Sequence, residues 1–213
     1  MVYSSLNKIF MLLLPFLVQS AFIRALGAEY LGLRGMFSSI LQVLSLAELG
    51  FGSALVYSRY DAIARDDKSE ICGLLHLYKR IYRRIGLIVF IVGTALAPFL
   101  KYLVKGDYPQ DINIYIVYML YLINTVLSYW MFAYKASLLN AYQRLDVVSI
   151  INTISNGLMQ ILQIGVIIWF RNFYAYLCLL ITATALNNLL TKVNVDRMFP
   201  EYRGEGSVSA ETL

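Results

Sequence analysis

Six long apolar stretches dominate this sequence and restrict the folds open to it. An α-helix needs about 20 mainly apolar residues to cross roughly 30 Å of membrane hydrocarbon. Little of the 213-residue chain lies outside stretches of about that length. They are residues 9–26, 33–57, 85–103, 112–139, 147–170 and 173–190. The stretches predict an all-α integral membrane protein, with six spans forming one transmembrane lobe over residues 1–192.

The composition agrees with membrane insertion. Apolar residues make up 59% of the chain and charged residues 15%, whereas soluble domains have about 45–50% and about 25%. The first stretch, with Lys8 before it, has the outline of a secretory signal peptide. Arg24 lies where cleavage would have to occur, however, and the apolar part is longer than such signals need. We therefore expect residues 9–26 to remain as a helix.

The positive charges predict how the chain is oriented in the membrane. If the N-terminus is cytoplasmic, 13 of the 18 Lys and Arg residues fall on the cytoplasmic side and five on the outer side. Because cytoplasmic loops carry an excess of Lys and Arg, this distribution places both termini in the cytoplasm. The formal charge of +5 then reflects topology and an affinity for anionic membrane lipids. It gives no reason to expect nucleic-acid binding.

The connection between the second and third spans is long enough to have structure of its own. Apolar residues from Ile71 to Tyr82 recur at helical spacing, with basic residues largely off that stripe. Asp67 and Glu70 form an approximate capping box at its start. We expect an amphipathic cytoplasmic helix that lies on the inner leaflet and then turns into the third span. The alternative is the lower end of one long, partly projecting helix.

The other parts outside the spans are short or polar. The outer connections are too short to form an extracellular catalytic domain. Residues 193–213 are polar and contain Gly and Ser without periodicity, which predicts a disordered cytoplasmic tail. The two cysteines, Cys72 and Cys178, do not indicate a disulfide framework.

Polar side chains recur every three or four residues in four of the spans, so they lie on one face of each helix. In the fifth span they are Ser149, Asn152, Thr153, Asn156, Gln160 and Gln163. The fourth carries Tyr121, Asn124, Thr125, Ser128 and Lys135, the sixth Thr184, Asn187, Asn188 and Thr191, and the second Ser38, Gln42, Ser45, Glu48 and Gly52. Such residues either hydrogen-bond between helices, at about 0.6–2 kcal/mol each, or line a wet cavity. A continuous stripe along one helix favours a hydrated cavity at the fifth span.

The carboxylate of Glu48 lies well inside the second span, in the segment LSLAELGFGSAL. An acidic side chain near the centre of a span costs about 2.5–3.5 kcal/mol, so a proton or a basic group must compensate for it. The candidate cations are Arg24, Arg34 and Lys135. The alternative is a glutamate that is hydrogen-bonded to neighbouring groups and holds a kink in the helix.

The sequence contains no pattern typical of an enzyme or a metal site. His76 is the only histidine, and Cys72 precedes it by four residues, but two ligands do not form a metal site. A phosphate-binding P-loop, which ATP-driven transport within this chain would require, does not occur in the sequence. We therefore expect no catalytic residues, no metal and no cofactor.

Several segments are similar to a known transporter family. LGAEYLGL, SLAELGFGSALVYS and LNAYQR are the most specific of them, and the similarity runs over nearly the whole chain. The chain resembles the bacterial Wzx-type oligosaccharide flippases of the multidrug/oligosaccharidyl-lipid/polysaccharide exporter superfamily. Members have two six-helix lobes with a cavity between them, so the chain resembles the N-terminal lobe of a MATE-like exporter. Many relatives have an arginine in the middle of the first span, where this chain has Gln19.

The resemblance implies transport in the biosynthesis of cell-surface polysaccharide such as O-antigen or capsule. An undecaprenyl-diphosphate-linked oligosaccharide would move from the inner to the outer leaflet of the bacterial cytoplasmic (inner) membrane by alternating access. A second six-helix lobe or another copy of the chain would be the partner. An ion-coupled drug or metabolite antiporter of the same superfamily, or a non-transporting fragment, is the alternative.

The candidate pathway residues combine the polar stripes with the resemblance. Glu48 and Lys135 would act in ion or substrate coupling, and Arg24 would lie near the outer gate. Asn152, Asn156 and Gln160 would line the sugar path. The remaining candidates are Gln19, Ser45, Asn124 and Ser128.

Overall fold

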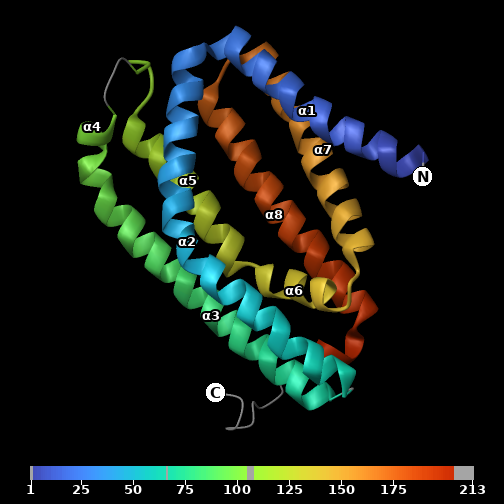
Figure 1. Ribbon diagram of the computed structural model, residues 1–213. Coiled ribbons are helices and arrows are strands. Elements are labelled where there is room, and N and C mark those ends of the chain that lie inside the picture. The colour runs from blue at the N-terminus through green and yellow to red at the C-terminus, as the bar shows by residue number, and fades with distance from the viewer. Residues whose placement is uncertain (1, 66, 105–107, 204–213) are drawn as a thin grey trace.

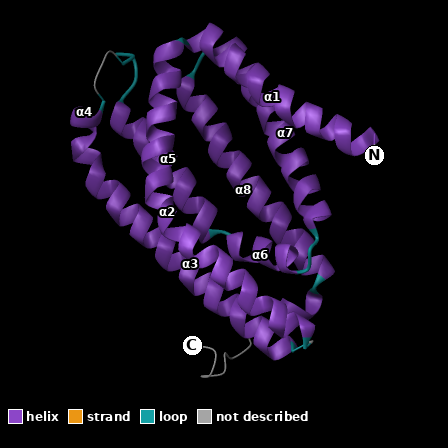
Figure 2. Ribbon diagram, viewed as in Figure 1, coloured by secondary structure: helices purple, strands orange, loops and turns teal. Residues whose placement is uncertain are grey.

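The computed structural model of the chain describes residues 2–65, 67–104 and 108–203, although the side chains of 2–12, 46–62, 64 and 203 lie outside the described set. Helices joined by short loops account for the described residues, and no strand occurs among them (Figures 1 and 2). The predicted all-α fold class is therefore confirmed.

Eight α-helices and two 3₁₀ turns are described. The helices are α1 (Val2–Leu26), α2 (Ala28–Ala64), α3 (Lys68–Leu96), α4 (Leu100–Leu103), α5 (Ile114–Trp130), α6 (Ala133–Ala141), α7 (Leu145–Phe170) and α8 (Phe173–Met198), and the turns are η1 (Ala97–Phe99) and η2 (Pro200–Arg203). Asparagine side chains accept backbone N–H groups at two of the helix starts, as N-caps do. Asn113 caps α5 and Asn172 caps α8, with N···O distances of 3.0 Å and 3.1 Å.

Several of these helices are long and apolar enough to cross a membrane. Within the described residues they are Lys68–Leu103, Leu145–Phe170 and Phe173–Met198, and the bent pair of α5 and α6 makes a fourth if it is one span. The apolar part of α1 with described side chains, Leu13–Leu26, is shorter. Three to four candidate spans are compatible with a membrane protein, and the six spans and the MATE-like lobe stay predictions.

The connection before the third predicted span is not a separate leaflet helix. α3 is a single helix from Lys68 to Leu96, so the expected turn before the third span is wrong and the alternative of one long helix is the structure. The apolar stripe of its first half is covered by protein: Ile71 and Tyr78 are no more than 1% exposed and pack in a cluster with Leu138 and Val195. Because this apolar stripe is buried against α6 and α8, it does not form a lipid-facing surface.

The predicted fourth span is interrupted between α5 and α6. The two helices meet at an angle of 49°, and α6 crosses between the lower ends of α5 and α7 (Figure 1). Met131 and Phe132 leave helical backbone angles, and the freed N–H of Phe132 donates to Asn188 Oδ1 at 3.2 Å. The side chain from α8 thus replaces a lost helical hydrogen bond. Lys135 lies beyond this break, so it does not continue the stripe of Asn124 and Ser128 as expected.

The polypeptide after residue 192 is helical rather than an unstructured tail as far as the structure describes it. α8 continues to Met198, and η2 packs back against α3 and α8. The hydroxyl groups of Tyr142 and Tyr202 form a hydrogen bond of 2.6 Å, and the Phe199 ring lies beside both, at 4.6 Å from the Tyr142 centroid and 6.0 Å from the Tyr202 centroid. Residues 204–213 lie outside the described part.

Aromatic side chains make up much of the core at the end of the bundle where α1 meets α2. Phe22 packs edge-on against Tyr176 at 5.2 Å, and Phe37 against Tyr118 at 5.5 Å between ring centroids. Such pairs contribute about 0.5–1.5 kcal/mol each beyond burial. The Tyr30 hydroxyl donates to Asp111 at 2.5 Å, and burial together with this carboxylate raises the pKa of Tyr30. The core therefore clamps α1, α2, α5 and α8 together at this end.

Glycine allows α3 and α5 to approach closely. A Cβ atom at Gly86 would lie 2.5 Å from the Trp130 indole, and one at Gly93 would overlap the Leu122 side chain. The Tyr118 hydroxyl donates to the Gly93 carbonyl at 2.8 Å across the same contact. Small residues that let two backbones approach are typical of helix packing in membranes.

Candidate functional site

Four helices, α1, α2, α7 and α8, line a polar cavity of about 170 Å³. Its wall consists of Pro15, Val18, Gln19, Arg34, Asn156, Met159, Gln160, Gln163, Tyr176, Leu180 and Ala183. One cation and four amide side chains thus converge on one space, within an otherwise apolar wall. We refer to this space as the arginine cavity.

Arg34 supplies the positive charge of the arginine cavity. It is the seventh residue of α2, about 9 Å along the helix from the first residue at 1.5 Å per residue. The guanidinium carbon lies 5.9 Å from the ring centroid of Phe22 and 5.7 Å from that of Tyr176. Both contacts are within the range of cation–π attraction. The two rings position the guanidinium without neutralising its charge.

No described carboxylate forms an ion pair with Arg34. A guanidinium presents several N–H donors in a planar fork that matches carboxylate and phosphate groups. A half-buried arginine that lacks a described carboxylate partner is therefore suited to an anionic ligand.

The amide groups supply hydrogen-bonding capacity next to this charge. Gln19 comes from α1, whereas Asn156, Gln160 and Gln163 come from one face of α7. The Oε1 atom of Gln160 is buried and has no hydrogen-bond partner among the described residues. Leaving such an atom unpaired costs about 1–3 kcal/mol, and unpaired polar atoms are rare in native interiors. This oxygen is therefore positioned for a water molecule or a ligand hydroxyl.

The volume limits what the arginine cavity can enclose. Because water occupies about 30 Å³ per molecule in the liquid, 170 Å³ has room for a handful of waters. Sites that enclose drug-sized ligands have about 300–1,000 Å³. The cavity can therefore hold one charged or polar group of a larger molecule, and not a whole oligosaccharide.

The polar stripe of α7 has two different roles along its length. Asn152 Oδ1 and Ser155 Oγ accept hydrogen bonds from Asn187 Nδ2 of α8, at 2.7 Å and 2.9 Å. Asn156 and Gln160, one turn further along, line the arginine cavity. One part of the stripe, Asn152 and Ser155, therefore forms contacts between helices. The other part, Asn156 and Gln160, lines a cavity.

The other candidates from the second and fourth spans do not reach this cavity. Asn124 accepts a hydrogen bond from the Thr184 hydroxyl of α8 at 2.7 Å. Ser45 and Ser128 donate to carbonyl groups of their own helices, at 2.9 Å and 2.6 Å. Arg24 is exposed near the end of α1 and is not part of the cavity wall.

The side chain of Glu48 lies outside the described residues, so its expected role stays a prediction. Its position on α2 is helical. Of the three candidate cations, Arg34 is in the arginine cavity, and Lys135 forms an ion pair with a different carboxylate, that of Asp196.

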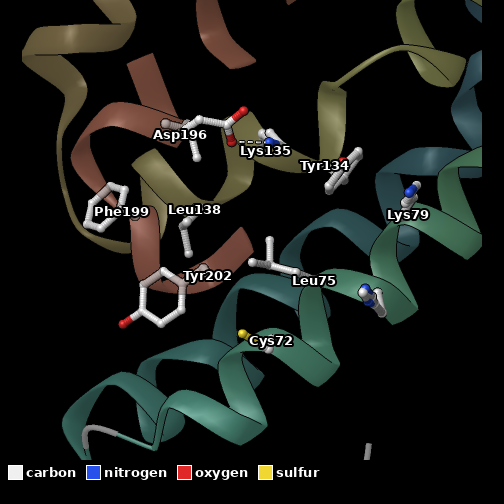
Figure 3. A pocket seen from close by; sticks show the side chains of 11 residues that line it. Cys72, Leu75, Lys79, Tyr134, Lys135, Leu138, Asp196, Phe199 and Tyr202 are labelled. Atoms are coloured by element: carbon white, nitrogen blue, oxygen red, sulfur yellow. Dashed lines mark hydrogen bonds and ion pairs between the residues drawn. The ribbon is translucent and has the colours of Figure 1, made fainter. Parts of the chain in front are cut away.

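Lys135 and Asp196 belong to a second cavity, of about 250 Å³, between α3, α6, α8 and η2 (Figure 3). Its wall consists of Cys72, Leu75, His76, Lys79, Tyr134, Lys135, Leu138, Val195, Asp196, Phe199 and Tyr202. The Lys135 and Asp196 side chains are 16% and 19% exposed. In Figure 3 the Lys135 ammonium points at the Asp196 carboxylate across the gap between α6 and α8. We refer to this space as the ion-pair cavity.

Two residues of these sites, Tyr176 and Asp196, escaped the sequence-based candidate set, and Arg34 entered it only as a possible cation for Glu48. Arg34 lies near the end of an apolar stretch, where cations are common, and only its contact with two rings distinguishes it. Tyr176 is one of 17 tyrosines. Asp196 lies in the segment expected to be a tail, although Val195 beside it is buried on the same face of α8 as Thr191.

Comparison with known proteins gave no match. No protein-family model, no curated protein and no solved structure matches this chain. Among the described residues, no group of three His, Cys, Asp or Glu side chains is placed to hold a metal ion. Functional inference therefore depends on the two cavities and on the sequence.

Proposed function

We propose that this chain is one lobe of a membrane transporter that moves lipid-linked oligosaccharide from the inner to the outer leaflet of the bacterial cytoplasmic membrane. Both termini would be cytoplasmic, as the distribution of Lys and Arg predicts. The substrate would be an undecaprenyl-diphosphate-linked sugar unit, and a second lobe or a second copy of the chain would complete the pathway. The observation that carries the proposal is the arginine cavity.

The chemistry of the arginine cavity matches the polar part of such a substrate. Arg34 has no described carboxylate partner and could bind a phosphate group of the diphosphate. Gln160 and Asn156 could hydrogen-bond sugar hydroxyls. Amide groups suit hydroxyls because each offers both donors and an acceptor. A cavity of about 170 Å³ would receive one phosphate or one sugar at a time while the lipid tail remains in the bilayer.

The positive charge of Arg34 argues against the alternative function within the superfamily, which is the export of hydrophobic cations by an antiporter. A guanidinium at the polar site repels a cationic drug, and like-charge contacts in a poorly solvated site are costly. The lipid-linked sugar is therefore the better match to the described residues.

Proteoliposomes containing the full chain provide the test. A fluorescent undecaprenyl-diphosphate sugar is incorporated, and its arrival in the opposite leaflet is followed by chemical quenching of the accessible fluorophore. With two copies of the chain completing the pathway, we expect transport by the wild-type chain and at least tenfold slower transport by Arg34→Gln, because one charge-assisted hydrogen bond contributes about 1.5–3 kcal/mol. Arg34→Lys, which keeps the charge but loses the planar fork, should be intermediate.

Lys101→Gln is the matched control, because it removes an exposed cation that lies outside the arginine cavity. It should transport at the wild-type rate. Equal rates for Arg34→Gln and the wild-type chain would refute the role of the cavity. No transport of the sugar lipid by the wild-type chain, together with export of a hydrophobic cation, would favour the antiporter.

A further inference from the structure

A groove on α3, separate from the arginine cavity, collects basic side chains on one face of the helix. The groove has a volume of about 400 Å³ and is lined by His76, Lys79, Arg80, Arg83, Arg84 and Leu87. These positions follow one another by three, one, three, one and three residues, which is the spacing of a single helical face. We refer to them as the basic groove.

None of the cations of the basic groove forms an ion pair with a described carboxylate. The carboxylates of Glu70, Glu201 and Asp196 pair with Arg65, Lys68 and Lys135, which lie outside the groove. Lys79 lies over the Tyr134 ring at 6.0 Å, which leaves its charge in place. Four cations on one helix face repel one another, so an external anion would stabilise them.

The basic groove adjoins the surface of α3 that would face lipid. Leu87, within the groove, is 47% exposed, and Ile88 and Ile91 beyond it are each 57% exposed. The indole N–H of Trp130 donates to the Arg83 carbonyl at 3.1 Å. Tryptophan is enriched at membrane surfaces, where its ring meets hydrocarbon and its N–H meets polar groups. The groove thus joins a positive surface to an apolar one.

We propose that the basic groove binds the headgroup phosphate of an anionic phospholipid, with one acyl chain along Leu87 and Ile91. Arg80, Arg83 and Arg84 hold the phosphate oxygens, as guanidinium groups do in bidentate contacts. The exposed apolar residues distinguish this ligand from a free phosphate, which has nothing to place against them. Basic pockets at the cytoplasmic side of membrane helices bind such headgroups. The proposal rests on the membrane insertion proposed above, but not on the transported substrate.

The tryptophans of the chain provide a local reporter. There are two, and Trp169→Phe leaves Trp130, beside Arg83, as the only one. The full chain carrying this change is reconstituted into phosphatidylcholine vesicles that contain a small fraction of brominated phosphatidylglycerol or, separately, brominated phosphatidylcholine. Bromine quenches tryptophan on contact, so the ratio of the two quenching efficiencies reports which lipid occupies the surface near Trp130.

We expect an enrichment of brominated phosphatidylglycerol of roughly tenfold around Trp130, and a persisting preference in about 1 M salt, where the Debye length is only about 3 Å. The triple variant Arg80→Gln, Arg83→Gln, Arg84→Gln should reduce the enrichment to nearly one. The single variant Arg84→Gln should reduce it in part. Lys101→Gln with Arg171→Gln, which removes exposed cations outside the groove, should leave it unchanged.

Three results would overturn the proposal. The first is that the triple variant keeps the enrichment of brominated phosphatidylglycerol. This result counts only if its circular dichroism and its quenching by brominated phosphatidylcholine match the wild type, which shows that the variant is folded and inserted. The second is a wild-type preference that disappears in high salt, which indicates diffuse attraction alone. The third is displacement of the lipid by soluble glycerol phosphate at constant ionic strength, which indicates a free-anion site. Absence of quenching by either lipid would contradict membrane insertion of this face, whereas a failure of sugar transport alone would leave the lipid site intact.

Discussion

In the arginine cavity, Arg34 lies against two aromatic rings and no described carboxylate pairs with it, whereas in the ion-pair cavity, at the other end of α8, Lys135 is paired with Asp196. Both cations are largely enclosed by helices. The difference lies in where the compensating charge comes from. A cation whose counter-ion belongs to a neighbouring helix stabilises the fold, while a cation held by neutral rings keeps its binding capacity for a ligand.

The largest effect on stability is expected at the ion pair. Lys135→Ala leaves the Asp196 carboxylate without its lysine in a site where that side chain is 19% exposed. Removing one partner of a buried pair costs about 3–5 kcal/mol, and the residual exposure here lowers our expectation to about 2–3 kcal/mol. Thermal unfolding in detergent, followed by circular dichroism, measures the change.

Arg144→Ala is the matched control for that experiment. Its partner Asp146 is two residues away, and the two side chains are 45% and 58% exposed, so we expect no measurable change in Tm. The double replacement Lys135→Met, Asp196→Leu should recover most of the stability, because it removes both charges from the cavity. Equal losses at Lys135 and Arg144 would show that the ion-pair cavity is solvated and does not join α6 to α8.

The second largest effect is expected between the two cavities, at Asn187. Asn187→Leu removes the hydrogen bonds to Asn152 and Ser155 and should lower the unfolding free energy by about 1–2 kcal/mol. Asn194→Leu loses only a bond to the Leu190 carbonyl of its own helix and should change stability less. If both replacements are neutral, the polar contact between α7 and α8 does not hold these helices together.

A smaller effect of opposite sign is expected at Gln160 in the arginine cavity. Gln160→Met removes a buried oxygen that has no described partner and should raise the unfolding free energy by about 1 kcal/mol when no ligand is present. Gln42→Met, at an exposed position of α2, should have no effect. A loss of stability at Gln160 would instead show that water already satisfies the oxygen, which would make the cavity hydrated at rest.

The smallest effect on stability is expected at Arg34, which completes the contrast with Lys135. Arg34→Met loses two cation–π contacts of about 0.5–1 kcal/mol each, and it also removes a poorly solvated charge. Losing the cation–π contacts lowers the free energy of unfolding and removing the charge raises it. We therefore expect the free energy of unfolding to change by no more than about 0.5 kcal/mol. The same variant should bind the sugar lipid at least tenfold more weakly, measured by titration in detergent. A large loss of stability with unchanged binding would give Arg34 the structural role assigned here to Lys135.

Helix ends and loops show how far local patterns can be interpreted. The predicted fifth span, 147–170, corresponds closely to α7, Leu145–Phe170, because a long apolar run and the turn signals around it are local features. The predicted fourth span, 112–139, missed the break after Trp130. That break is stabilised by Asn188, a residue 56 positions away in sequence from Phe132. No local pattern in the fourth span contains this partner.

The candidate site shows the same division. Asn156 and Gln160 were identified as pathway residues from the polar stripe of the fifth span and Gln19 from the family resemblance, and all three line one cavity. Lys135 was grouped with Asn124 by helical spacing, yet the break separates them and each forms its own interhelical contact. Spacing predicts which residues share a face of one helix. It does not predict which neighbouring helix covers that face.

The amino-acid sequence by itself determined the all-α fold, the long apolar helices and the polar faces, because helix formation and apolar periodicity depend on residues a few positions apart. Only the tertiary structure decided which positive charges are balanced. Arg34, Lys135 and Arg84 are all cations near apolar stretches, and nothing local separates them. Packing between distant segments paired Lys135 with Asp196 and left Arg34 and Arg84 without a counter-ion among the described residues.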